Sequence, residues 1–568
     1  MLSLGIGDGA EHSVLLAIGS LANGQGACRM PRRTFWAPIG VPLPLLVFVA
    51  GVALSLLTLR HIVSALWNAD VRALGRVLNA ISALLLGTLF LSTAFAAAAP
   101  GKTWIIGAMV ISPERPDAGQ VLHVLIEGDR IATVTPAVPA DITDAAIVRA
   151  EGLYLIPGLM DSHVHLTSIP AIPYPMRAQH PDLVEAYLRQ VPRSFLRYGY
   201  TTVVDLIVTD PRPLQSMRAA PAHPDIYDCG GALPVPNGYP SQNAPAEYRF
   251  RVFPNTVVDP AHTANFPASE DPTAHTPRAA VERILKGGGI CVKTFFERGF
   301  GRDRNLPVPS ADLMQEIVAA AAAARVPVLL HASSIEAQTF GLENGISIFA
   351  HGLWNWAPHT GGQAMPPEVQ AVLDRVVERS IGYQATLQVI AGLQLLYDPG
   401  YLDRADVRRV IPAALLTWYR SNEAQWYKRD LAQGTSDSDM RERYGATLQR
   451  GGRVVKYLAQ HQARFLFGTD TPSGPTIGNL PGLNGYLEMQ RLVDAGLSLR
   501  QLLEAATLSN AKAFGLDGQI GTIQPGKRAN LVLLGSSPLE SVQAYDSIQG
   551  IWVGGKHFLP GDLEADRQ

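Results

Sequence analysis

The stretch PGLMDSHVH at residues 157–165 decides the fold. A Pro-Gly turn leads into a short apolar run, which predicts a buried β-strand that ends in two histidines. Side chains two positions apart in a strand share a face, so His163 and His165 point the same way, with Asp161 behind them. Two neutral imidazoles at this spacing can bind one divalent metal ion, although His-x-His alone is weak evidence. Residues further along the chain strengthen this interpretation.

The composition excludes some classes of protein. With 568 residues the chain is long enough for one large α/β domain and a smaller one. Its 47 basic and 49 acidic residues nearly cancel, so no nucleic-acid partner is expected. Cys28, Cys229 and Cys291 form neither a disulfide framework nor a Cys-x-x-Cys metal pair, and they leave the redox compartment open.

The first hundred residues differ from the rest. Residues 41–59 and 77–99 are free of charge, and each run is about as long as a membrane-spanning helix. The second run follows Arg72 and Arg76 and ends in small residues, which is the layout of a secretory signal peptide. We therefore expect a protein that is exported to the periplasm or the exterior, or anchored in the membrane.

Two alternatives for this region stay open. A helical hairpin of both runs would attach the chain to the membrane and leave the remainder in the cytoplasm. Counting positive charges does not decide, because arginines lie both before and after the first run. Translation could also begin near Val71, and residues 1–70 would then not be part of the protein.

From about residue 105 the chain alternates strand and helix signals. Short strands within 121–131 and 147–154, and again within 530–534 and 548–553, predict a small β-sandwich built from both ends. Between them, eight apolar strands alternate with helices, which predicts an α/β fold of the (β/α)8 TIM-barrel type. The expected barrel strands are 157–165, 201–206, 225–229, 289–295, 326–331, 346–351, 381–386 and 464–470.

These signals divide the chain into four parts. The predicted parts are a hydrophobic targeting region (1–99), the first part of the sandwich (100–156), the barrel (157–515) and the second part of the sandwich (516–568).

Polar residues stand at the ends of five predicted barrel strands. Active sites of this fold lie at the carboxyl ends of the strands, so these side chains should emerge on one face. They are His163 and His165 in strand one, Lys293 in strand four, His331 in strand five, His351 in strand six and Asp470 in strand eight.

The ordered motifs resemble the amidohydrolase superfamily, and most closely its imidazolonepropionase-like and prolidase-like branch. The matching text is PGLMDSHVHL (157–166), YGYTTVVD (198–205), VKTF (292–295), LLHAS (329–333), AHG (350–352), GTDTP (468–472), EAATLSNAKAFGL (504–516) and IGTIQPGKRANLVLL (520–534). The resemblance spans about residues 105–558 and implies a barrel with a small sandwich. Asn530 departs from the pattern, which usually has Asp there.

The resemblance also implies a site for two divalent metal ions, expected to be zinc. His163 and His165 would bind the first ion, with Asp470 at its edge, and His331 and His351 would bind the second. Lys293 would bridge them as its carbamate, formed with CO₂, because a free ammonium among cations is strongly disfavoured. Mononuclear relatives lack this lysine, so its presence favours two metals.

The implied reaction is hydrolysis of a C–N bond, an amide in a small substrate such as a dipeptide or an N-acyl amino acid. A metal-bridging hydroxide would attack the carbonyl, and Asp470 would pass the proton to the leaving nitrogen. A cyclic-amide hydrolase, a lactonase, a deaminase and a membrane-anchored binding protein without turnover stay open. Membrane association and assembly into a homo-oligomer are also undecided.

Substrate contacts are expected in the loops after the strands. Residues 233–277 hold nine prolines and several aromatic residues, including Tyr239, which favours an ordered lid over the metals. Trp354 and His359 follow strand six closely and would line the mouth of the pocket.

Overall fold

The computed structural model describes residues 101–565, apart from 116–118, 139–141, 143, 301–303 and 360–363. The predicted targeting region, with its apolar runs at 41–59 and 77–99, lies outside the described residues. Within the described ranges, no helix is both long enough and apolar enough to cross a membrane.

Eight parallel segments form a closed barrel. Seven are regular strands: β6 Leu159–Val164, β7 Tyr200–Asp205, β8 Asp225–Asp228, β9 Val292–Phe295, β10 Val328–His331, β11 Ile348–Phe349 and β12 Gly382–Tyr383. They pair in the orders β6-β7-β8 and β9-β10-β11-β12. Isolated parallel bridges complete the ring: Leu233 with Thr294, Tyr383 with Phe465, and Val164 with Thr471. Residues 465–471 thus act as strand eight, and the predicted barrel is confirmed.

Helices follow the strands and bury one face against the barrel. In the helix at Ala311–Ala324, Ser310 accepts a hydrogen bond from the N–H of Leu313, and the buried side chains recur three or four positions apart. The longer helices are α4 Pro181–Arg197, α5 Pro211–Ala219, α7 Pro277–Lys286, α8 Ala311–Ala324, α9 Ile335–Glu343, α10 Pro367–Glu378, α11 Leu387–Leu395, α15 Asp437–Gln460 and α16 Leu483–Asp494. Shorter ones are α6 Arg249–Val252, α12 Ala405–Val410, α13 Ala413–Tyr419, α14 Trp426–Ala432, α17 Leu499–Glu504, α18 Asn510–Ala513 and α19 Pro560–Leu563.

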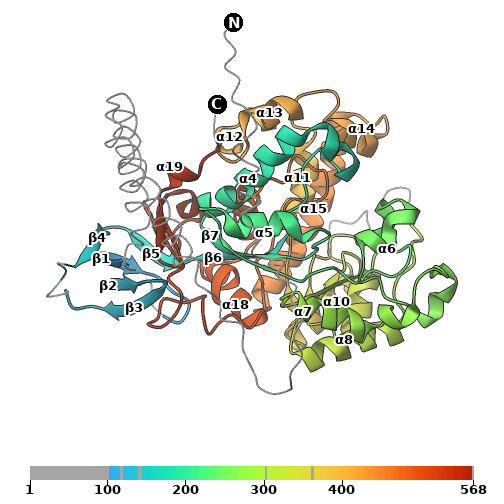
Figure 1. Cartoon of the computed structure of the whole chain (residues 1–568), viewed down its shortest axis with the longest axis horizontal. Coiled ribbons are helices and arrows are strands. Elements are labelled where there is room, and N and C mark those ends of the chain that lie inside the picture. Colours follow the sequence, from blue (N-terminus) through green and yellow to red (C-terminus); the bar gives the residue numbers. More distant parts are fainter. Residues whose placement is uncertain are drawn as a thin grey trace, which may run out of the picture. The chain divides into compact units, whose positions relative to one another are not determined.

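The two ends of the described chain meet in one small domain. Its strands are β1 Lys102–Val110, β2 Gln120–Glu127, β3 Arg130–Thr135, β4 Ala145–Arg149, β5 Tyr154–Pro157, β13 Leu531–Leu534, β14 Ile548–Val553 and β15 Lys556–Phe558. They pair in the order β15-β14-β13-β5-β1-β2-β3, with β4 beside β1, and Figure 1 shows β1, β2 and β3 side by side.

The strands of this small domain are joined by hydrogen bonds into one continuous sheet, because β5 pairs with β1 on one side and β13 on the other. Leu122, Val124, Leu531 and Trp552 belong to one buried cluster, so the sheet encloses its own core. Whether it packs as the predicted sandwich stays a prediction.

The cysteines also differ from the expectation. Cys229 and Cys291 form a disulfide across 62 residues of sequence. Cys229 directly follows β8 and Cys291 directly precedes β9, and these barrel strands are neighbours, which brings the two Cα atoms to 4.5 Å. Spacing along the chain does not reveal such a pairing, because it depends on which strands become neighbours.

Asn530 connects the small domain to the barrel. Its side-chain amide donates a hydrogen bond of 2.8 Å to the Asp225 carboxylate, and its oxygen accepts one of 2.8 Å from the N–H of Gly554. Arg528 also pairs with Asp225, at 2.7 and 3.0 Å. The departure from the family's usual Asp thus places a donor where a second carboxylate would face Asp225.

We therefore expect Asn530→Asp to destabilise the fold by about 1–3 kcal/mol, because the buried donor is lost and two carboxylates become neighbours. Denaturant unfolding of the purified protein measures the change. The exposed Asn422 provides the matched control, since Asn422→Asp should leave the unfolding free energy nearly unchanged. An Asn530→Asp protein as stable as the wild type would contradict this account of the junction.

Candidate metal centre

The predicted metal-binding residues come together at the carboxyl ends of the barrel strands. The ring centroids of His163 and His351 lie 5.1 Å apart, and those of His331 and His351 lie 4.3 Å apart. Ligand atoms of His163, His351 and Asp470 all lie within 4.8 Å of one another, which suits one metal ion. We use the name strand-end cluster for His163, His165, Lys293, His331, His351 and Asp470.

A glycine allows strand eight to approach strand one. A Cβ atom at Gly468 would lie 2.7 Å from the Cβ atom of His163, which no real pair of side chains tolerates. Two residues later, Asp470 has a φ of +58° and donates its backbone N–H to the carbonyl of His163 at 2.7 Å. This left-handed conformation is uncommon outside glycine, and it holds the carboxylate in the cluster.

The buried carboxylate of Asp161 links barrel strands one and eight by hydrogen bonds. Its carboxylate accepts hydrogen bonds from the N–H of His163, the N–H of Thr469 and the hydroxyl of Thr469, at 3.2, 3.1 and 2.6 Å. Complete burial raises the pKa of Asp161 to about 7 in spite of these donors. Asp161 therefore orients the backbone of strand one at His163 and the backbone of strand eight at Thr469.

Several polar atoms of the strand-end cluster are buried without a hydrogen bond. Within the described part of the chain, His163 Nε2, His331 Nε2 and Lys293 Nζ make no hydrogen bond. His163 Nε2 lies 3.0 Å from Asp470 Oδ1, but the angles of a hydrogen bond are not met. Unpaired buried polar groups are costly, and imidazole nitrogens beside a carboxylate are typical zinc ligands. The cluster therefore fits divalent metal ions.

Burial controls the charges of the cluster. It lowers the pKa of His163 to about 3, with a further contribution from Lys293, and it lowers the pKa of His351 well below the usual range. Both imidazoles are therefore neutral, the form that binds metal. Burial also lowers the pKa of Lys293 to about 7, opposed by Asp470, so the neutral amine is accessible near neutral pH.

Asp470 behaves differently from the other members of the cluster. Burial alone would raise the pKa of its carboxyl group, but the neighbouring imidazoles of His163 and His165 outweigh burial and hold the pKa well below its usual range. His165 Nε2 lies 2.8 Å from Asp470 Oδ1. The carboxylate is therefore ionised and oriented.

Three polar residues beside the cluster were not expected from the sequence. Gln384 Oε1 lies 3.1 Å from His163 Nδ1, Thr386 Oγ1 lies 3.0 Å from His351 Nδ1, and Glu297 Oε2 lies 3.5 Å from His331 Nε2. Thr386 has a φ of +44°, a strained value for a β-branched residue. Their positions in the sequence were the available signal, because all three lie within three residues of the end of a short strand.

The predicted substrate contacts lie in different surroundings. The ring of Tyr239 lies 4.8 Å from that of His331, and Trp354, only 6% exposed, lies 5.5 Å from His351. His359 instead lies at the surface, 3.7 Å from Glu368. The structure thus brings Tyr239 and Trp354 to the cluster, and places His359 beside an exposed carboxylate.

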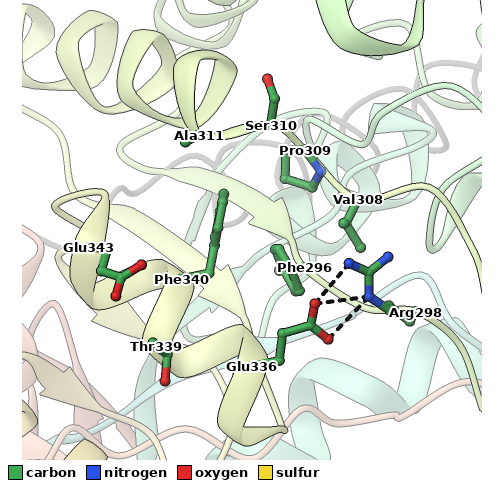
Figure 2. A pocket seen from close by; sticks show the side chains of 10 residues that line it. All are labelled: Phe296, Arg298, Val308, Pro309, Ser310, Ala311, Glu336, Thr339, Phe340 and Glu343. Atoms are coloured by element: carbon green, nitrogen blue, oxygen red, sulfur yellow. Dashed lines mark hydrogen bonds and ion pairs between the residues drawn. The ribbon is translucent and has the colours of Figure 1, made fainter.

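A hollow of about 460 Å³ lies between the segment after β9 and helix α9 (Figure 2). The ion pair of Arg298 with Glu336, at 2.8 Å, forms part of its wall. No member of the strand-end cluster lines this hollow, so it is separate from the candidate metal centre. The lining residues are Phe296, Arg298, Val308, Pro309, Ser310, Ala311, Glu336, Thr339, Phe340 and Glu343.

Solved structures of low sequence identity share this fold. A Xaa-Pro dipeptidase with bound methionine matches with a TM-score of 0.58 at 16% identity, over 81% of this chain and 100% of its own. A prolidase complexed with N-methylphosphonate-L-proline matches with a TM-score of 0.58 at 20% identity, over 81% and 99%. Ochratoxinase of A. niger matches with a TM-score of 0.57 at 20% identity, over 82% and 98%.

Curated proteins are similar over shorter stretches. A probable guanine deaminase of Deinococcus radiodurans is 35% identical over an alignment of 121 residues that covers 17% of this chain and 28% of that protein. The guanine deaminase of Escherichia coli is 33% identical over 115 residues, which are 20% of this chain and 26% of that protein. The matches thus span only about a quarter of these relatives.

The amidohydrolase family model matches residues 154–352 and 421–557. These ranges are more than half of the chain, and they contain all six residues of the strand-end cluster. The chain therefore belongs to the amidohydrolase family of metal-dependent hydrolytic enzymes.

Proposed function

We propose that this protein hydrolyses the amide bond of a small substrate, such as a dipeptide or an N-acyl amino acid, with two divalent metal ions. The observation that supports it most is the strand-end cluster itself, which joins the neutral imidazoles of His163 and His351 to one ionised carboxylate and a lysine, and in which three buried polar atoms make no hydrogen bond. The likeness to a Xaa-Pro dipeptidase and a prolidase also favours an amide substrate.

In this proposal the strand-end cluster holds both metals. His163, His165 and Asp470 would bind the first, His331 and His351 the second, and Lys293 as its carbamate would lie between them. When bound, such metals, expected to be zinc, polarise a carbonyl and lower the pKa of a coordinated water.

In this proposal Asp470 moves the proton. Its carboxylate lies 2.8 Å from His165 Nε2 and 3.0 Å from His163 Nε2, so it faces the centre of the cluster. As an ionised group it can accept a proton from the attacking water and deliver it to the leaving nitrogen. Its strained backbone conformation fits a functional position rather than a structural one.

Charge explains why Lys293 would be modified. Four neutral histidines and one carboxylate would leave about +3 with two divalent cations, and an ammonium would raise this further. A carbamate supplies a negative charge instead and lowers the total to about +2. Lys293 is only 1% exposed, so solvent cannot screen an excess charge there.

Tyr239, Trp354 and His359 remain the proposed substrate contacts. Tyr239 is the best supported, because its ring also lies 5.7 Å from Phe295 and 5.5 Å from Phe300 at the same end of the barrel. His359 would have to leave Glu368 to reach a substrate.

A deaminase is the second candidate, since the reported curated relatives are guanine deaminases. Metal analysis of the purified protein, followed by assays with dipeptides, N-acyl amino acids, cyclic amides, lactones and guanine, separates the candidates. We expect about two metal ions per chain and the highest kcat/KM among the dipeptides or N-acyl amino acids. Ammonia release from guanine without amide hydrolysis would establish the alternative, and bound metal without any turnover would favour a binding protein.

Asp470→Asn is nearly isosteric, so the metals should still bind while proton transfer fails. We expect kcat to fall by roughly 10²–10⁴ on the best substrate of the panel. Steady-state kinetics and metal analysis test this together, with Asp312→Asn at the exposed start of α8 as the control. Activity within a few-fold of the wild type would show that another group transfers the proton.

Lys293→Ala should lose most of the second metal and nearly all turnover, because the bridging anion is absent, while the fold persists. A short carboxylic acid added to the assay should restore part of the activity by filling the vacated space. Mass-spectrometric metal counts report the loss, with the exposed Lys286→Ala as the control. A wild-type count near one, with unmodified Lys293 in a high-resolution map, would refute the two-metal proposal.

A further inference from the structure

The side chain of His163 makes one defined contact through Nδ1. Gln384 Oε1 lies 3.1 Å from this atom, and both residues are fully buried. A neutral imidazole has one protonated nitrogen and one with a free lone pair, and only the second can bind a metal. Whether His163 can act as a ligand through Nε2 therefore depends on what Gln384 presents to Nδ1.

The orientation of Gln384 can be traced back to backbone groups through Asn510. The Asn510 amide donates to the carbonyls of Met160 and Phe467, at 2.8 and 2.7 Å. Carbonyls only accept, so these bonds assign the nitrogen. The remaining Asn510 oxygen accepts the N–H of Phe467 at 3.1 Å, in agreement with that assignment.

Ser162 is the next residue in the chain of hydrogen bonds. Its hydroxyl lies 2.8 Å from the carbonyl of Phe467 and 3.0 Å from the side-chain oxygen of Asn510, and both groups accept. The hydroxyl donates to these two acceptors. The Ser162 oxygen is then an acceptor toward its third neighbour, Gln384.

Gln384 is the last residue in this chain of hydrogen bonds before His163. Its amide nitrogen donates to the hydroxyl oxygen of Ser162 at 2.8 Å and to the Ser162 carbonyl at 3.3 Å. The amide oxygen therefore faces His163 Nδ1, which must donate to it. The opposite amide orientation would place the amide oxygen against the carbonyl oxygen of Ser162, two acceptors with no proton between them, and an N–H₂ group against the imidazole, in a site 0% exposed to water.

We propose that Gln384 is a positioning residue that keeps the proton of His163 on Nδ1 and leaves the Nε2 lone pair directed into the strand-end cluster. His163 Nε2 makes no hydrogen bond among the described residues although Asp470 Oδ1 lies 3.0 Å away, so two acceptors face each other there, as two ligands of one metal ion would. The inference rests on the proposed metal centre and adds a role for barrel strand seven, which contributes no ligand.

The neighbouring Thr386 does not allow the same conclusion. Its hydroxyl lies 3.0 Å from His351 Nδ1, but a hydroxyl can donate or accept, and it therefore suits either tautomer. The amide nitrogen of Gln384 already donates to Ser162, so the oxygen faces His163, and an amide oxygen can only accept. Gln384 is thus the residue of strand seven whose chemistry specifies a protonation state.

The test compares two substitutions at Gln384 with a matched control in the full-length protein after removal of metal. Gln384→Met removes the acceptor, whereas Gln384→Glu keeps an oxygen for Nδ1 but loses the donor to Ser162. Gln190→Met is the control, because Gln190 is also buried, 3% exposed, and donates to Ser194 and Leu563 at 3.0 Å. The probes are zinc affinity by chelator competition and the thermal midpoint of the metal-free protein.

We expect Gln384→Met to weaken zinc binding by about 10–100-fold, the usual effect of losing a residue that orients a ligand. Gln384→Glu should stay within about tenfold of the wild type even though a buried carboxylate lowers its thermal midpoint. Gln190→Met should lower the midpoint without changing the affinity. In metal-free protein labelled with ¹⁵N-histidine, the Nδ1–H signal that His163→Asn removes should weaken in Gln384→Met.

Each negative result of this test has a different meaning. Equal zinc affinity in the wild type and Gln384→Met would overturn the role of Gln384 and leave the metal centre intact. An equal loss in Gln384→Met and Gln190→Met would also overturn it, because general destabilisation would then explain both. A wild-type protein that takes up no zinc would overturn the proposed function itself, and the inference with it.

Discussion

The close approach of barrel strands one and eight is the constraint on which the rest of the site depends. It requires glycine at position 468, because a Cβ atom there would lie 2.7 Å from that of His163. Asp161 then joins the two strands by accepting from His163 and Thr469. Only this spacing lets the carboxylate of Asp470 lie beside two histidines that are 305 or more residues away in sequence.

Burial sets the protonation states in this arrangement. The same desolvation keeps His163 and His351 neutral and brings the pKa of Lys293 down to about 7. It also leaves polar atoms unpaired, and the backbone is strained at Asp470 and Thr386. Such costs are typical of functional sites, where the remaining structure must stabilise an arrangement that is unfavourable by itself.

The fold does not by itself specify the substrate. A dipeptidase, a prolidase and an ochratoxinase share this barrel at 16–20% identity. One barrel can therefore serve several reactions, and the choice rests with the residues around the strand ends and in the loops. In this protein the aromatic contact of Tyr239 with His331 is the clearest such feature.

The sequence by itself determined the barrel and its strand-end residues, because both are local signals. An apolar strand that ends in histidine, as in VLLH at Val328–His331, shows which side chain leaves the core and on which face. The sequence could not show that Gln384 faces His163, that Cys229 pairs with Cys291, or that one continuous sheet joins the two ends of the described chain. Those contacts depend on the tilt and stagger with which the strands close. Only the tertiary structure decides these contacts. When the barrel closes, it brings together residues that are far apart in the sequence, and their separation along the chain does not show which residue will face which.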